Sequence, residues 1–127
     1  MDVCKGIVEI DNDLVIKPGY KFQEFKETKY YTNQDGIRII YLDSPKKINN
    51  REYYVSLFFR EGKINVLSLI CSDTEYSEKD EPMRKELHDS ILKEMGLHNS
   101  SEFEWGQIKS NYDARSNVSS IDIVYIK

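Results

Sequence analysis

Two β-rich runs, residues 52–60 (EYYVSLFFR) and 63–71 (KINVLSLIC), lie on either side of the dipeptide Glu61-Gly62. A two-residue connection that contains glycine is typical of a tight β-hairpin, because glycine readily adopts the positive φ of such a turn. One face of the first run is apolar: Tyr53, Val55, Leu57 and Phe59. In the second run strict alternation puts Ile64, Val66, Ser68 and Ile70 on one face, and Leu67, Leu69 and Cys71 on the other. Apolar groups on both faces predict central strands that are at least partly covered on both sides.

The segments before this hairpin are shorter. Residues 37–42 (IRIIYL) read as a strand, and the loop that begins at Ser44-Pro45 is expected to continue to about residue 50. Two short apolar stretches within residues 5–16 predict an edge hairpin or a bent strand. Phe22 and Phe25 are three residues apart, which favours one or two helical turns over residues 20–27, although alternation in the same segment also fits a strand.

After the hairpin, a helix is predicted from about residue 81 to residue 95, with Asp80 as its N-cap and Gly96 as its terminator. Its expected apolar stripe consists of Met83, Leu87, Ile91 and Met95, widened by Leu92. The last part of the chain predicts a second hairpin, with strands at 103–110 and 118–126 and a connection at 111–117.

This order of elements predicts a single α+β domain over residues 1–127. We expect a mostly antiparallel sheet of about six strands, the main helix at 81–95 and a short N-terminal helix at about 20–27. The length of 127 residues is enough to bury a core without metal ions or disulfide bonds.

The net charge and the hydropathy of the chain argue against some classes of function. A formal net charge of −4 argues against direct binding to the phosphate backbone of nucleic acids. No apolar run reaches the length of a membrane span, and the N-terminus lacks the pattern of a secretory signal, so a cytoplasmic protein is expected. A reducing compartment would keep Cys4 and Cys71 as thiols, whereas a disulfide between them remains open for an exported chain.

The sequence contains little that indicates a metal site or a catalytic site. The two histidines, His88 and His98, are not spaced with cysteines or carboxylates as in zinc or iron sites, so no metal and no cofactor is predicted. A cysteine–histidine nucleophile would require Cys4 or Cys71 to meet a histidine in space, and nothing local brings them together. His98 follows the main helix, where a capping or surface role is expected. The interpretation is therefore a protein that is not an enzyme.

An acidic stretch follows the first hairpin, in which only Lys79 opposes the carboxylates of residues 73–81. Such a stretch is usually a solvated loop. Its functional interpretation is electrostatic, because a dense negative patch steers a basic partner and raises the association rate. The residues predicted to bind a partner are Asp73, Glu75, Tyr76, Glu78, Asp80 and Glu81, with Glu102, Glu104, Tyr112 and Asp113 as a second patch.

The C-terminal pattern combines Trp105-Gly106, Tyr112-Asp113 and Ser119-Ser120-Ile121-Asp122-Ile123 with Tyr125. Together with the plan of a small acidic chain that has a sheet and one main helix, this pattern resembles the immunity proteins of bacterial polymorphic toxin systems, in particular those of contact-dependent growth inhibition. The motif covers the last 23 residues, 105–127, of the chain. The resemblance implies a cytosolic inhibitor that occludes the active site of a toxin domain with acidic groups, and it implies no catalytic residue.

The expected function is therefore a non-enzymatic immunity protein that binds a basic cognate toxin, with a nuclease as the leading example. Two alternatives stay open at this stage: a small-ligand-binding or assembly module that uses the sheet face, and an enzyme with a histidine or cysteine site. Tyrosine-rich edges permit a homo-oligomer but do not require one.

Overall fold

The computed structural model describes residues 1–126, and it confirms the α+β class. One antiparallel sheet has the strand order β3-β5-β6-β9-β8-β7, and β4 pairs with β5 beside this path. The bounds of the strands are β1 (Val8–Glu9), β2 (Val15–Ile16), β3 (Ile39–Tyr41), β4 (Lys46–Ile48), β5 (Arg51–Arg60), β6 (Lys63–Cys71), β7 (Ser100–Phe103), β8 (Gly106–Asp113) and β9 (Val118–Tyr125). The helical elements are α1 (Phe22–Phe25), the 3₁₀ helix η1 (Glu78–Asp80) and α2 (Glu81–Glu94).

The β5–β6 hairpin around Glu61-Gly62 is confirmed, with positive φ at both turn residues. The prediction for the two faces of β6 is wrong in one respect. Phe58 pairs with Val66 and Phe59 pairs with Ile64, so Asn65 is an extra residue in β6 and forms a bulge. The bulge moves Ile64 to the same buried face as Leu67, whereas strict alternation had placed it with Val66.

Three expectations about strands and loops need correction. Residues 46–48, expected in a loop, form β4, because Asn49 and Asn50 both adopt positive φ and close a tight hairpin onto β5. The expected strand at 103–110 corresponds mainly to β8, which begins only at Gly106 after a turn at residues 104–105, and the strand before this turn, β7, was not expected. The connection between β8 and β9 is consequently shorter than residues 111–117, since β8 continues to Asp113.

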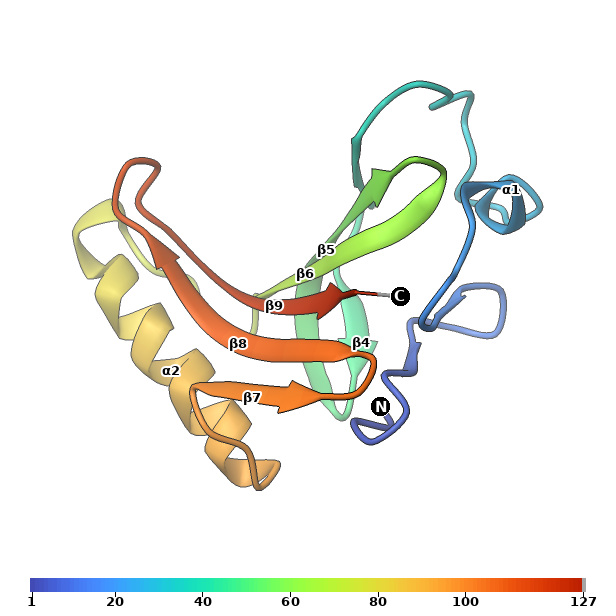
Figure 1. Ribbon diagram of the computed structural model, residues 1–127. Helices are drawn as coiled ribbons and strands as arrows, with labels where there is room; N and C mark the ends of the chain where they lie inside the picture. Colours follow the sequence, from blue (N-terminus) through green and yellow to red (C-terminus); the bar gives the residue numbers. More distant parts are fainter. Residues whose placement is uncertain (127) are drawn as a thin grey trace.

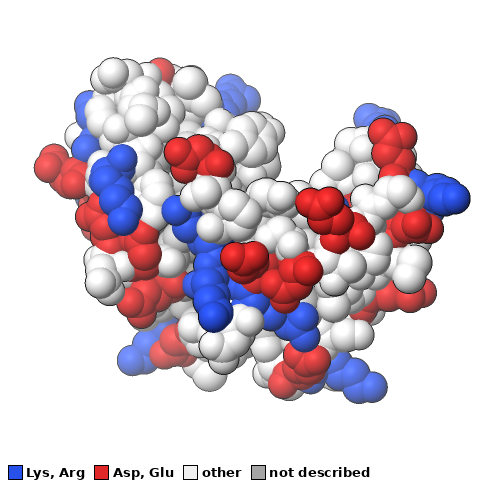
Figure 2. Space-filling view, turned by 180° about the vertical axis from the view of Figure 1, so that it is seen from behind, with Lys and Arg blue, Asp and Glu red and all other residues white. Residues whose placement is uncertain are grey.

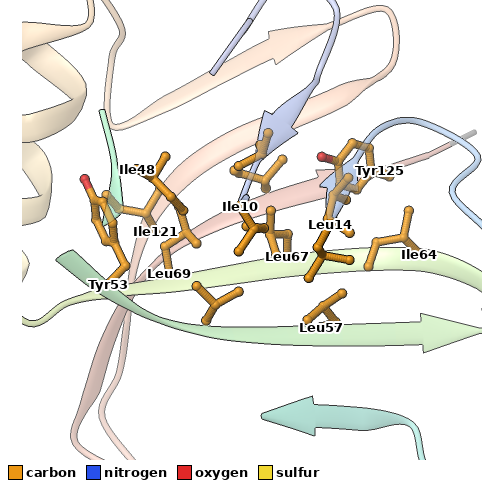
Figure 3. Packing of buried hydrophobic residues seen from close by; sticks show 14 of the residues in the cluster. Ile10, Leu14, Ile48, Tyr53, Leu57, Ile64, Leu67, Leu69, Ile121 and Tyr125 are labelled. Carbon is orange, nitrogen blue, oxygen red and sulfur yellow. The ribbon is translucent and has the colours of Figure 1, made fainter. Parts of the chain in front are cut away.

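The sheet bends strongly, and other elements cover only one of its faces, which we call the inner face (Figure 1). Helix α2 packs under β8 and β9. The N-terminal segment forms a hairpin, one of the two structures expected for it, but this hairpin is the separate two-stranded sheet β1-β2 and not an edge of the large sheet. Its residues Ile10 and Leu14 lie among Leu57, Leu67 and Tyr125 of the large sheet (Figure 3). The core is therefore filled by the inner face of the sheet, α2 and the N-terminal segment.

Helix α2 begins at Glu81 as predicted and ends one residue before the predicted Met95. Its buried face differs from the predicted stripe. Met83 is 54% exposed and Leu87 is only partly buried, whereas His88, Ile91 and Leu92 are buried. The first half of the helix thus contacts the sheet through polar groups, which the spacing of apolar residues does not reveal.

Candidate interaction surfaces

The acidic stretch starts at the end of β6 and runs toward the beginning of α2. Asp73, its first carboxylate, accepts a hydrogen bond from the backbone N–H of Glu52 at 2.8 Å and lies 3.5 Å from the Arg51 guanidinium. Arg51 also contacts Glu94 near the end of α2, at 3.3 Å. Asp73 is therefore largely neutralised, and it lies near the opposite end of α2 from Glu78 and Asp80.

Glu81, predicted to bind a partner, is not a free surface acid. The residue is 5% exposed, and both carboxylate oxygens lie 3.1 Å from Nη1 of Arg84. The backbone N–H of Ser119 donates to Oε1 at 3.2 Å, and the Ser119 hydroxyl donates to the Glu81 carbonyl at 3.3 Å. Burial and these contacts make Glu81 the joint between α2 and β9, which corrects its sequence-based assignment.

Two segments far apart in the sequence meet beside this joint. The hydroxyl of Tyr112 donates to Oδ1 of Asn117 at 2.7 Å, and Nδ2 of the same asparagine donates to the Glu78 carbonyl at 2.6 Å. These bonds tie the β8–β9 turn to η1. They bring part of the second predicted patch, Tyr112 and Asp113, next to part of the first.

We call the resulting surface the acidic end; its members are Glu75, Tyr76, Glu78, Asp80, Tyr112 and Asp113. The carboxylates of Glu75 and Glu78 are exposed and have no ion pair within residues 1–126. Asp80 accepts the Ser77 hydroxyl at 2.8 Å. The ring of Tyr76 is partly buried, with the Arg84 guanidinium 5.2 Å from its centroid, so its orientation is held by a cation–π contact.

Glu102 and Glu104 do not join the acidic end. Glu102 lies on the edge strand β7, and Glu104 lies in the turn that precedes β8. Asp113 ends the eight-residue strand β8, so Glu104 and Asp113 are about 25 Å apart along the sheet. The second patch predicted from the sequence is therefore two separate places.

The second face of the large sheet, which we call the open face, is not covered by α1, α2 or the N-terminal segment. A cross-strand row of apolar residues crosses it: Ile39, Phe58, Val66 and Val124. Tyr41 is 72% exposed and Tyr54 47% exposed. The predicted partial cover of this face comes from neighbouring side chains and not from a helix: Phe58, Val66 and Val124 are half-buried. Figure 2 shows the molecule hollowed between two lobes, with uncharged side chains over much of the floor of the hollow.

Cys71 and His88 do meet, although not as a nucleophile and its base. The backbone N–H of Cys71 donates to Nε2 of His88 at 3.0 Å, and both side chains are fully buried. Burial raises the pKa of the Cys71 thiol and lowers the pKa of His88 to about 4. A neutral imidazole whose acceptor nitrogen is occupied by an amide does not activate a thiol. Both cysteines are free thiols.

The residues that carry the resemblance also have structural contacts. The Trp105 indole N–H donates to the Val3 carbonyl at 3.0 Å, and the Tyr125 hydroxyl donates to the Gly6 carbonyl at 2.9 Å. Gly6 is required there, because a Cβ would lie 2.5 Å from the Trp105 ring. These contacts hold the N-terminal segment against β9 and against the turn that precedes β8.

No group of three or more His, Cys, Asp or Glu residues within residues 1–126 is arranged to hold a metal ion. None of the helices in this part of the chain is long and apolar enough to cross a membrane. No protein-family model, curated protein or solved structure matches the chain.

Proposed function

We propose that this protein is a non-enzymatic immunity protein that acts in the cytosol by binding a basic toxin domain and covering its active site with the acidic end. The observation that carries the proposal is the pair of hydrogen bonds of Asn117, at 2.7 and 2.6 Å, which holds the β8–β9 turn against η1. This pairing concentrates unneutralised carboxylates and two tyrosines on one exposed surface.

The chemistry of the acidic end suits a basic partner. Exposed carboxylates attract lysine and arginine at long range and speed the encounter, while tyrosine rings supply contact area with little loss of conformational entropy. A tight complex buries about 800 Å² on each partner and involves about 20–30 residues a side, many more than the residues of the acidic end. The neighbouring open face, with exposed Tyr54 and half-buried Val124, would supply the remaining contact area.

The test begins with capture of the tagged full-length protein from its own host. The expected partner is a basic protein, bound one to one, that is toxic when expressed alone and harmless when this chain is expressed with it. Failure of this chain to suppress the toxicity of the proteins it captures would overturn the proposed function.

A separate set of variants tests whether the acidic end is the surface that binds the partner. Reversal of charge at Glu75, Glu78 and Asp80, each to lysine, should weaken binding by about tenfold or more and slow association, with a smaller salt dependence. The matched control reverses Glu9, Glu27 and Glu86, whose exposed carboxylates make no ion pair in the described part of the chain. Equal losses in both triple variants would show that overall charge, and not the acidic end, drives the association.

A further inference from the structure

A groove lies at the opposite arm of the molecule from the acidic end, at the tip of the β5–β6 hairpin. Residues 36–39 form one wall, residues 58–62 together with Asn65 form the other, and Phe22 of α1 contributes to the lining. Its volume is about 760 Å³. Pockets that bind drug-sized molecules have volumes of roughly 300–1,000 Å³. Figure 1 shows the chain passing in an arch from α1 to β3 above this hairpin tip.

Backbone hydrogen bonds hold α1 against the hairpin. The N–H of Phe22 donates to the Gly62 carbonyl at 2.8 Å, and the N–H of Ile64 donates to the Tyr20 carbonyl at 2.8 Å. The ring of Phe22 packs edge-on against Phe59, with centroids 5.3 Å apart. The part of the lining made by Phe22 and Phe59 is therefore preformed, which lowers the entropic cost of binding a ligand.

An apolar side chain is exposed at the rim. Ile37 lies on the arch with 51% of its surface accessible, and it lines the groove together with half-buried Ile39 and Phe58. Isolated exposed isoleucines are common on protein surfaces. Here the exposed group lines the same groove as Ile39 and Phe58, so a ligand with an apolar body in the groove would cover it.

The charge of the groove is opposite to that of the chain. Arg38 and Arg60 both line it and are exposed, and neither forms an ion pair within residues 1–126. The single carboxylate in the lining belongs to Glu61, in the hairpin turn. In a protein with a net charge of −4, two arginines without ion pairs beside an aromatic wall favour an anion.

We propose that this groove binds a small apolar anion, with an aromatic or aliphatic body against Ile37, Ile39 and Phe58 and one acidic head group held by the exposed guanidinium groups that line the groove, those of Arg38 and Arg60. A carboxylate, a sulfonate or a phosphate would serve, because each presents oxygen atoms that match the donors of a guanidinium. The site is independent of the proposed toxin-binding function, since it lies on the other arm of the sheet.

A pair of fluorescent probes tests the proposal on the full-length protein. Anilinonaphthalene sulfonate carries an aromatic body and one anionic group, whereas N-phenylnaphthylamine has nearly the same body without the charge. We expect saturable one-to-one binding of the anionic probe, weakened about tenfold or more in the double variant Arg38→Gln/Arg60→Gln. Binding of the neutral probe should change by less than about twofold in the same variant, because its body makes no charged contact.

The control double variant Lys47→Gln/Arg115→Gln removes two exposed cations elsewhere and should bind both probes like the wild type. Ile37→Ser, at an exposed position, should weaken both probes by about threefold through loss of apolar contact. The amide resonances of Gly36 and Gly62 should shift when the anionic probe is added to the wild-type protein.

An unchanged affinity for the anionic probe in the Arg38→Gln/Arg60→Gln variant would overturn the proposal. So would probe-induced shifts confined to resonances outside the groove, a result that does not depend on any variant.

Discussion

Protonation of His88 should make the fold sensitive to mild acid. The imidazole is fully buried, Nε2 accepts the Cys71 N–H at 3.0 Å, and Nδ1 has no hydrogen-bond partner within residues 1–126. Protonation would place a charge in the core and break the bond from Cys71. Desolvation, with a further contribution from Arg84, lowers the pKa from 6.5 to about 4, although Asp89 opposes the shift.

The direction in which pH changes the free energy of unfolding follows from proton linkage. The unfolded chain takes up the proton below about pH 6.5, whereas the folded chain does so only near pH 4. The stabilisation from a neutral His88 is therefore complete above pH 6.5 and is lost progressively as the pH falls toward 4. The full shift corresponds to about 3 kcal/mol, of which about 2 kcal/mol is lost between roughly pH 7.5 and pH 5.

Urea unfolding at a series of pH values measures this effect, with the fluorescence of the buried single tryptophan, Trp105, as the signal. His88→Gln is the informative variant, because a glutamine oxygen can accept the Cys71 N–H and carries no charge. Its stability should fall by about 2 kcal/mol less than that of the wild type between roughly pH 7.5 and pH 5. The carboxylates titrate in both proteins and cancel in the comparison.

His98→Gln provides the control, because His98 is exposed and should leave the wild-type pH dependence unchanged. If wild type and His88→Gln lose stability in parallel over this range, the buried histidine does not determine the acid sensitivity of the fold.

Three further predictions concern single positions. Glu81→Ala removes the carboxylate that pairs with Arg84 in a mostly buried site and should lower the free energy of unfolding by about 3 kcal/mol in urea titrations; a loss below about 1 kcal/mol would mean that solvent already screens the pair. Asn50→Val places a β-branched residue at a φ of 68° and should cost about 1–2 kcal/mol, whereas Asn50→Gly should unfold near the wild-type midpoint. With a thiol reagent at neutral pH, exposed Cys4 should react at once and buried Cys71 only as the protein unfolds; equally fast reaction of both would contradict the burial of Cys71.

Local patterns explain why much of the fold could be predicted. The β5–β6 hairpin depends on two alternating runs and a turn of two residues, all within 20 residues of chain. Ile121, Ile123 and Tyr125 alternate along β9 and are buried, which is a local pattern of the same kind. β4 was not predicted, because Ser44-Pro45 and the lysines that follow indicated only a loop. The turn that pairs β4 with β5 depends on the positive φ of Asn49 and Asn50.

The candidate surfaces could be predicted only in part. The acids of residues 73–81 are visible as a cluster in the sequence, but which of them stay free depends on partners that lie far away along the chain. Arg51 neutralises Asp73, and Ser119 together with Arg84 takes Glu81 into the interior. The side chain of Asn117, which joins the β8–β9 turn to η1, carries no sequence signal of such a role.

The class of the fold, the central hairpin, the position of the main helix and the acidic character of the chain follow from local sequence, because each depends on the periodicity or composition of neighbouring residues. The tertiary structure alone decided that His88 is buried, that the open face lacks a covering layer and that the acidic end and the groove lie on opposite arms. Those features depend on contacts between residues that are distant in the sequence. The pairing of strands and the packing of α2 set these contacts, and a local pattern does not encode them.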